Sequence, residues 1–464
     1  MSRIFILSVN VSTEPYPVYP LGMAIIASAL ARRGHEIRQF DFLASGCSQD
    51  GLRQALREFS PDFVCISLRN IDNVDSFSLE KAWYLPLARE QVGIVREVTV
   101  ARIIVGGPGF SLMPEDILEF IGADYGIAGE GETAVCEMVA ALADGVSMPR
   151  VFSAKQKPLS CNEMIAPLYD KGLLDFHMAH SGMLNLQTKR GCPYICGYCT
   201  YPSLEGGRFR PRDPGAVVDD VERAWRDYGV GSFFFTDSIF NDPVGHHLKV
   251  AEELVRRNLP VKWTGFFRPQ GISRGKLALL KRSGLYAVEF GTDATCDATL
   301  LAMTKGFTFA EVLDANEACL AEEIPCAHSV IFGGPDETPD TVQEGLRNME
   351  KLGNSIVFAF SGIRILPDTA IHARAIREGV LDAGASLLKP TYYFSPEITP
   401  ETMNALIMKS FRNRGNRIFP PSSGLERLAV LKRFGFRGIL WDRLISFNGR
   451  EEWTSFKLII RHQD

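Results

Sequence analysis

The sequence has no strong excess of charge of either sign: 50 Lys and Arg residues stand against 55 Asp and Glu residues, for a formal net charge of −5. Proteins that bind nucleic acids or anionic membranes usually carry a clear basic excess, so this balance predicts no nucleic-acid partner. Long apolar runs are lacking as well. The first run, IFILSV, is far shorter than the roughly 20 residues that cross a bilayer. We therefore expect no transmembrane segment and no signal peptide.

The sequence also lacks the setting in which disulfides form. Seven of its ten cysteines are scattered, and some, such as Cys65 and Cys136, lie in apolar segments where a thiol packs as a small hydrophobic group. Scattered cysteines without a secretory signal do not predict a disulfide framework. We therefore expect a reducing, cytoplasmic location.

The 464 residues are enough for about two or three domains. Over residues 1–145, short apolar runs such as IFILSV, EIRQFD and FVCISL alternate with helical patterns, including ones near 50–59, 79–97 and 114–121. This alternation predicts an α/β domain with a doubly wound, Rossmann-like parallel sheet. Ligands of such sheets bind beyond the carboxyl ends of the strands.

The rest of the chain divides into three parts. Residues 146–182 have no long periodic pattern and are expected to form a linker. Six strand–helix units over 183–384 predict a partial (β/α)6 barrel of the TIM type, in which functional groups lie on the loops after the strands. Residues 385–464 form a less regular C-terminal domain. Its basic stretch indicates either a solvated helix face or a surface for a lipid or an anionic substrate.

Three cysteines stand close together in TKRGCPYICGYCTYP, directly after the first predicted barrel strand: Cys192, Cys196 and Cys199. Thiolates on one short loop can converge on one inorganic centre. A cubane iron–sulfur cluster held by three cysteines leaves one iron open to a small molecule. The alternative is zinc, which needs a fourth ligand, and the candidates for it are Cys161, His177 and His180.

The spacing CxxxCxxC, with the aromatic Tyr198 before the third cysteine, resembles the signature of the radical S-adenosylmethionine enzymes. The resemblance covers roughly 183–385. It implies that the three cysteines hold a [4Fe-4S] cluster and that S-adenosylmethionine chelates the fourth iron with its amino and carboxylate groups. It also implies that Tyr198 lies at this cofactor.

Two further segments agree with this family. VEFGTDA resembles its fourth-strand segment and implies that Glu289 contacts the ribose, the alternative being an ordinary charged residue at a strand end. IFGGPDET resembles the glycine-rich stretch near the adenine and implies a role there for Gly333 and Gly334. Arg268 follows the third strand and is expected to contact a cofactor or the substrate in the barrel mouth.

The second strand departs from the family pattern, because it ends in FTDSIFND rather than in the Gly-Gly-Glu type of segment that meets the methionine amine. Asp237 is expected to replace it, ahead of Asn241. The alternative is that Asp237 caps the following helix.

The segments YPLGMAIIASALARRGHEIRQFD, VGGPGFSLMPED and DYGIAGEGETA together resemble the domain that precedes the barrel in cobalamin (B12)-dependent radical S-adenosylmethionine enzymes. Glycines after strands let the backbone approach a flat corrin, and helix N-termini can meet its amides and phosphate. The residues implied in cobalamin binding are Asn10, Leu21, Gly22, Ser67, Arg69, Asn70, Gly106, Gly107, Pro108, Gly129, Glu130 and Gly131.

The DxHxxG motif, which supplies a histidine to cobalt in methionine synthase-like proteins, is absent, and His35 is expected to be structural. The lower face of a bound corrin would then have no protein histidine or would meet a residue such as Arg69 or Asn70. An unligated lower face would suit transfer of a methyl group as a radical. The alternative is that the domain binds no cobalamin and is a degenerate partner module.

The resemblance implies an enzyme that methylates an unactivated carbon of a small metabolite or lipid through a 5′-deoxyadenosyl radical and methylcobalamin, with flavodoxin or ferredoxin as electron donor. Its catalytic residues are not identified. The alternatives are a cyclisation, ring contraction or rearrangement without methyl transfer, and an iron–sulfur or zinc binding module without catalysis. An RNA methylthiotransferase is disfavoured, because no second cysteine set and no basic RNA-binding tail are evident.

Overall fold

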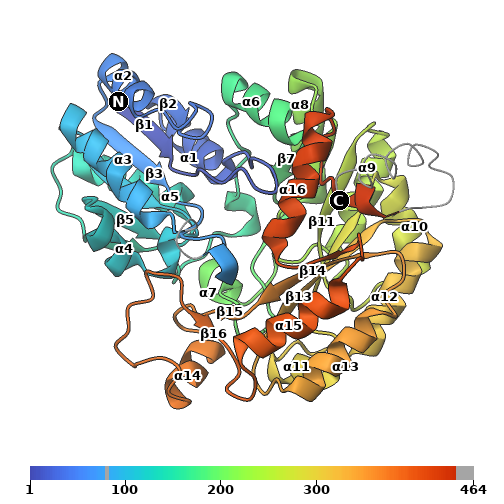
Figure 1. Ribbon diagram of the computed structural model, residues 1–464. Helices are drawn as coiled ribbons and strands as arrows, with labels where there is room; N and C mark the ends of the chain where they lie inside the picture. Colours follow the sequence, from blue (N-terminus) through green and yellow to red (C-terminus); the bar gives the residue numbers. More distant parts are fainter. Residues whose placement is uncertain (79–82, 446–464) are drawn as a thin grey trace.

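The computed structural model describes residues 1–78 and 83–445, and its N-terminal part is a six-stranded parallel sheet in the order β2-β1-β3-β4-β5-β6 (Figure 1). Helices α1 and α5 pack together against one face, and α2, α3 and α4 follow one another across the other. The strands are β1 (Arg3–Ser8), β2 (Glu36–Asp41), β3 (Phe63–Ser67), β4 (Arg102–Gly106), β5 (Tyr125–Ala128) and β6 (Val151–Ser153). The helices are α1 (Leu21–Ala31), α2 (Gln49–Phe59), η1 (Ser76–Ser78), α3 (Leu85–Val98), η2 (Phe110–Leu112), α4 (Pro114–Ile121) and α5 (Gly131–Ala143).

The helix expected near 79–97 begins later, at Leu85, with a proline in its first turn. The first residues of that expectation, 79–82, lie outside the described part of the chain. Proline fits at a helix start because its missing N–H would have no intrahelical partner there.

The segment expected to be an irregular linker contains regular structure. β6 pairs in parallel with β5 and so extends the N-terminal sheet, and it is followed by η3 (Cys161–Glu163) and α6 (Lys171–Ser181). β6 and η3 have three residues each, and α6 has 11. A three-residue edge strand has no periodicity that a sequence pattern can reveal, and its pairing is decided by the neighbouring strand.

The second large sheet has seven parallel strands in the order β17-β14-β13-β12-β11-β10-β7, with helices on its outside (Figure 1). Its strands are β7 (Leu184–Leu186), β10 (Ser232–Phe235), β11 (Lys262–Phe267), β12 (Val288–Asp293), β13 (Cys326–Phe332), β14 (Ile356–Ser361) and β17 (Arg417–Ile418). The intervening helices are α7 (Tyr201–Glu205), α8 (Pro214–Tyr228), α9 (His246–Arg257), α10 (Arg274–Arg282), α11 (Asp297–Ala302), α12 (Phe309–Ala321) and α13 (Pro339–Met349).

The α/β fold with a partial barrel is confirmed, with one addition: β17, from the region expected to be a separate C-terminal domain, pairs with β14. The remaining elements are the ribbons β8 (Lys189–Arg190) with β9 (Arg210–Pro211) and β15 (Ile363–Arg364) with β16 (Tyr392–Tyr393), and the helices α14 (Ala370–Arg377), α15 (Pro400–Phe411), α16 (Pro421–Arg433) and η4 (Trp441–Leu444). Within the described ranges, no helix combines the length and the apolarity needed to cross a membrane.

Candidate active site

The loop that carries the three cysteines is held in place by backbone hydrogen bonds on both sides. The Cys192 amide donates to the Gly206 carbonyl at 3.0 Å, and the Gly197 amide donates to the Met303 carbonyl at 2.9 Å. Gly191, just before the loop, has a φ of 85°, and a side chain at this position would collide with the carbonyl of Arg208. The loop therefore has a defined shape that requires glycine at its start.

The three cysteines are buried or partly buried, and their thiols lie close enough for their charges to interact. Burial raises the pKa of Cys192, and it raises the pKa of Cys199 to about 11, while each of these two thiols also senses the charge of Cys196. Without a metal the buried thiols keep their protons, and a metal centre that binds them displaces those protons. Two cations oppose this effect, Arg268 beside Cys192 and Lys305 beside Cys199.

The structure does not support a single zinc ion at the three thiols, whereas an iron–sulfur cluster accepts thiols that lie farther apart. Zinc bonds sulfur at about 2.3 Å, so its ligands must nearly touch one another. Among the described residues, no three His, Cys, Asp or Glu side chains are grouped closely enough to hold one ion. A cluster instead receives its three thiolates on three different irons, which sets them farther apart. The expected fourth zinc ligands are also engaged elsewhere: His177 is buried against Asp41 at 2.7 Å.

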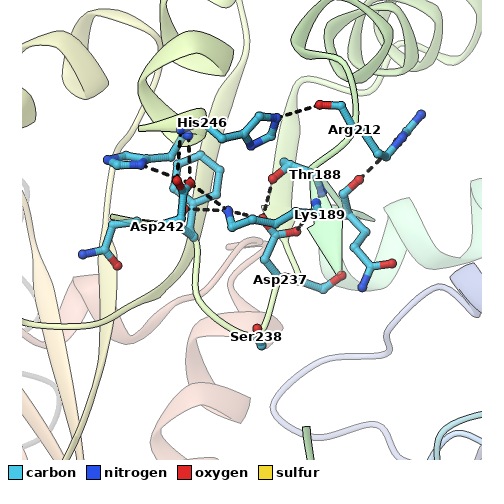
Figure 2. A network of polar contacts seen from close by, with 12 residues as sticks. Thr188, Lys189, Arg212, Asp237, Ser238, Asp242 and His246 are labelled. Carbon is cyan, nitrogen blue, oxygen red and sulfur yellow. Dashed lines mark hydrogen bonds and ion pairs between the residues drawn. The ribbon is translucent and has the colours of Figure 1, made fainter. Parts of the chain in front are cut away.

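We call the loop that carries Cys192, Cys196 and Cys199 the cluster loop. A buried network of charges supports its start (Figure 2). Lys189 Nζ contacts Asp237 at 2.9 Å and Asp242 at 3.5 Å, and it also donates to the Phe240 carbonyl at 2.7 Å. Asp237 accepts from the Thr188 amide at 2.7 Å and from the Thr188 hydroxyl. These ties join the strand before the cysteines to the loop after β10.

This network changes the interpretation of Asp237. Its two carboxylate oxygens are bonded to Thr188 and Lys189, so the geometry gives Asp237 a structural role and does not support its predicted contact with methionine. The capping alternative is wrong, because the amides at the start of α9 donate to Asp242 at 3.0 Å. Asn241 is engaged as well: its amide group bonds the backbone of Arg268 in both directions at 2.8 Å.

A second buried set of polar side chains contacts Tyr198 of the cluster loop. The Tyr198 hydroxyl and Lys305 Nζ both donate to Asp293, and Lys305 Nζ lies 3.3 Å from the Tyr198 oxygen. The Arg268 guanidinium lies 4.0 Å from the ring centre of Tyr194. Sequence reasoning identified Tyr198 and Arg268 but missed Asp293 and Lys305, which stand in GTDATCDATLLAMTKG without an assigned role.

The glycine-rich stretch after β13 forms hydrogen bonds within itself. The amides of Gly333 and Gly334 both donate to Glu337 Oε2, the second at 3.0 Å. Burial raises the pKa of Glu337 to about 7, although these amides lower it. The predicted contact of Gly333 and Gly334 with adenine is not tested, and in this structure their amide hydrogens already have an acceptor.

A large cavity lies between the N-terminal sheet and the mouth of the barrel, with a volume of about 860 Å³. This is near the upper end of the range for small-molecule sites, about 300 to 1,000 Å³. Every residue predicted to bind cobalamin lines it, from Asn10 to Gly131, and Glu289 lines it from the barrel side. Tyr198, Asp237, Arg268, Gly333 and Gly334 are not among its lining residues.

The sheet side of the cavity has the features that a corrin with amide arms requires. Helices α1 and α5 both begin at this wall, and neither start has a side-chain cap. The Leu21 amide of α1 donates to the Tyr19 carbonyl at 2.8 Å, but the amides that follow it in the first turn, and those at the start of α5, have no side-chain acceptor and can meet acceptor groups of a ligand. Gly107 has a different reason to be glycine, because a side chain there would come within 2.6 Å of the Leu68 carbonyl oxygen.

Arg69 is the cation on this wall, and its Nη2 lies 3.4 Å from Asn10 Oδ1. Burial lowers the pKa of Arg69. His35 lies elsewhere, accepting from the Ser2 amide at 3.2 Å, and no histidine of the described residues lines the cavity. The expectation that His35 is structural agrees with this position.

An ion-pair network joins the N-terminal domain to the barrel, and sequence reasoning missed it. Arg190, two residues before Cys192, contacts Glu130 at 3.2 Å and Glu132 at 2.6 Å, and Arg210 contacts Glu130 at 2.7 Å. Burial lowers the pKa of Arg190, but the two glutamates raise it more, above its ordinary value. The loop after β5 is thus tied directly to the cluster loop.

Comparisons with known proteins agree with both halves of the chain. The B12 binding domain model matches residues 7–139, and the Radical SAM superfamily model matches residues 186–349. Tryptophan 2-C-methyltransferase of Streptomyces laurentii is 24% identical over 431 residues, with 76% of this chain and 71% of that protein covered. The anaerobic magnesium-protoporphyrin IX monomethyl ester cyclase of Cereibacter sphaeroides is 26% identical over 355 residues, with 71% and 56% covered.

Among solved structures, the radical S-adenosylmethionine methyltransferase TsrM of Kitasatospora setae, with cobalamin and a [4Fe-4S] cluster bound, has a TM-score of 0.83 at 23% identity, and 96% of this chain and 97% of that chain are covered. That likeness concerns the fold. The two family models, in this order, match more than half of the residues. The chain belongs to the cobalamin-dependent radical S-adenosylmethionine enzymes.

Proposed function

We propose that this enzyme methylates an unactivated carbon of a small molecule. The observation that carries the proposal is the single cavity of about 860 Å³, because the wall suited to a corrin and the barrel interior next to the cluster loop open into the same space. A methyl donor on one wall could therefore reach a substrate held by the other. Bound together, the cofactors of this family supply a radical derived from S-adenosylmethionine and a transferable methyl group.

In this proposal Cys192, Cys196 and Cys199 hold the cluster, and the lining residues of the N-terminal sheet hold cobalamin. Arg69 would face the corrin in place of a histidine, consistent with its position on the sheet wall and with the missing histidine motif. Arg268 and Lys305 place two positive charges beside the thiolates and offset part of the negative charge of a bound cluster.

The protein itself contributes rigidity. Lys189 and Asp237, both almost fully buried, hold the strand before the cysteines. The Arg190 pairs fix the distance between the two walls. Such fixed positioning keeps reactive groups aligned.

A second candidate is a reaction without methyl transfer, such as a cyclisation. It is supported by the similarity to the magnesium-protoporphyrin cyclase, whose name describes ring formation. Product mass separates the two, because methylation adds the mass of one methylene and cyclisation does not. We further propose a reduced flavodoxin or ferredoxin as electron donor and a cytoplasmic location.

The test is anaerobic reconstitution with iron, sulfide and cobalamin, followed by S-adenosylmethionine labelled in its methyl group and a reductant. Transfer of label to a stable carbon position of an acceptor molecule supports the proposal. Consumption of S-adenosylmethionine to give an unlabelled product of altered skeleton supports the second candidate. If the protein binds neither iron nor cobalamin, both candidate functions are contradicted and a non-catalytic module remains.

A further inference from the structure

The barrel wall of the cavity differs in composition from the sheet wall. Asn185 of β7 is the strand partner of Phe234 of β10, and Phe266 of β11 is the strand partner of Glu289 of β12. Partners in register project to the same side of a sheet. All four line the cavity, together with Tyr16 from the loop after β1 and Trp441 of η4. We call these six residues the aromatic subsite.

The aromatic rings of this subsite leave apolar surface uncovered. Phe234 and Phe266 meet edge to face, with ring centres 5.0 Å apart and planes inclined by 66°. Phe266 is nevertheless 42% exposed although it is part of a central strand of the barrel. Since Phe266 lines the cavity, this exposed ring is surface that a bound molecule can cover. Rings arranged at such angles accept a further flat ring by stacking or edge contact.

The subsite also contains two polar groups that accept hydrogen bonds. Asn185 Oδ1 is buried and has no hydrogen-bond partner among the described residues. A buried acceptor without a partner is destabilising, so a ligand that donates to it gains affinity. Glu289 Oε1 accepts from the indole nitrogen of Trp441 at 2.9 Å, which orients its carboxyl group. Both groups call for a donor on the ligand.

The neighbours of Glu289 place it apart from the cluster loop. It is bonded to Trp441, and its charge acts on Tyr16 and Tyr286, which belong to the N-terminal loop and the barrel floor. The groups beside the cysteines are instead Arg268, Lys305 and Ser238. These contacts favour a role for Glu289 toward the substrate over the ribose contact implied by the sequence resemblance.

We propose that the aromatic subsite binds the methyl acceptor, and that this acceptor is a planar aromatic or heteroaromatic small molecule with an N–H or O–H donor on or beside its ring. Asn185 or Glu289 receives the donor, and Phe234, Phe266 and Trp441 contact the ring faces and edges. The assignment rests on the proposed function, because it takes the occupant of this wall to be the substrate.

The test uses two simple probes of the same shape, indole and benzofuran, of which only indole has an N–H donor. Binding is measured by equilibrium dialysis and ligand-observed NMR on the protein loaded with cluster, cobalamin and S-adenosylmethionine, without reductant, so that no turnover occurs. We expect indole to bind at least tenfold more tightly than benzofuran.

Variants separate the two kinds of contact. Indole has one N–H, so one of the two variants Asn185→Leu and Glu289→Leu should weaken indole binding about tenfold. Both should leave benzofuran binding unchanged, because each removes only an acceptor. Glu289→Gln keeps an acceptor oxygen and should retain indole binding within about threefold. Phe266→Ala should weaken both probes. Glu401→Gln, on the exposed start of α15, is the matched control and should change neither.

The cobalamin spectrum and the thermal midpoint of every variant show whether it is folded. If a leucine variant does not fold, Glu289→Gln keeps the test decisive. Equal binding of indole and benzofuran, or binding of neither, overturns the assignment. Indole affinity unchanged in both leucine variants also overturns it, and loss of S-adenosylmethionine affinity in Glu289→Leu would then favour the ribose contact.

The outcomes also separate this assignment from the proposed function. If indole binds as expected but no aromatic acceptor is ever methylated under reducing conditions, the subsite stands and the methylation proposal fails. If a non-aromatic acceptor is methylated and its binding is insensitive to Asn185→Leu and Glu289→Leu, the methylation proposal stands and the subsite assignment fails.

Discussion

The cluster loop and the carboxyl edge of the N-terminal sheet are both suited to a cofactor, but in different ways. The loop offers three thiols within eight residues, set in a backbone that is bonded on both sides. The sheet edge offers twelve predicted residues spread over the first 131 positions, most of them glycines or small polar residues around a hollow. The loop would hold its ligand by a few strong bonds, whereas the edge would hold its ligand by shape and by many weak contacts.

This difference predicts which substitutions have large effects on ligand binding. A metal–thiolate bond cannot be replaced by a neighbouring contact, so the loss of one ligand changes the site as a whole. A corrin bound along a broad wall keeps most of its contacts when one side chain is shortened, because each contributes about 1 kcal/mol. Effects of mutation should therefore be concentrated at the loop and diluted at the sheet edge.

The largest effect is expected for Cys196→Ala. The variant should lose the cluster, seen as loss of the broad visible absorbance and of nearly all bound iron after anaerobic reconstitution. Cobalamin binding should be retained, because the sheet edge is untouched. Cys161→Ala is the control, since Cys161 is exposed and outside the loop. Full iron content in Cys196→Ala would show that the three cysteines are not the ligand set.

Next in size is Lys189→Met, which removes the buried cation behind the loop. Asp237 and Asp242 would be left buried without it, and breaking a buried pair typically destabilises by about 3–5 kcal/mol. We expect a large drop in the thermal midpoint and poor cluster retention. Lys171→Met, on an exposed pair with Asp175, should shift the midpoint little. An unchanged midpoint in Lys189→Met would refute the supporting role of the network.

The barrel wall should show a pH effect of intermediate size. Burial raises the pKa of Glu289 to about 7 from its ordinary value of 4.5, so the folded state prefers the neutral carboxyl. Stability contributed by this group is therefore lost as pH rises from about 4.5 to 7, by up to about 3 kcal/mol. Thermal midpoints measured across this range should fall less in Glu289→Gln than in the parent. Parallel profiles would contradict the shift.

The smallest effect is expected on the sheet edge itself. Arg69→Met should weaken cobalamin binding by less than about tenfold, since it removes one polar contact among many, worth ~1 kcal/mol. His35→Ala should leave cobalamin affinity unchanged, because His35 is bonded to Ser2 and does not line the cavity. Titration of the corrin absorbance measures both. Complete loss of binding in either variant would mean that the edge depends on a single ligand after all.

Much of the fold was predictable because its signals are local. Strands such as β1 and β3 are continuous apolar runs, and α8 begins where Asp213 accepts from the Ala216 amide and Pro214 follows. The cluster loop was predictable for the same reason, as its ligands lie within eight positions. Short elements such as β6 and β17 were not, because two or three residues carry no period of their own.

Side-chain partners were the least predictable part. Asp237 was expected at a cofactor and is instead bonded to Lys189, an ordinary lysine of the sequence until the fold buries it. Asp293 stands in the VEFGTDA segment without an assigned role, and Lys305 carried no motif, yet both bond Tyr198 behind the cluster loop. A sequence pattern shows which residues repeat along an element and does not show which distant element supplies a partner.

By itself, the sequence determined the three-cysteine loop, the order of the two α/β units and the family to which they belong, because ligand spacing and strand–helix alternation are properties of neighbouring residues. Only the tertiary structure decided that both units open into one cavity, that Arg190 ties their loops together, and that Trp441 bonds Glu289 across 152 positions of the chain. The physical reason is that hydrogen bonds, ion pairs and cavities form between surfaces that folding brings together, at separations that no local pattern records.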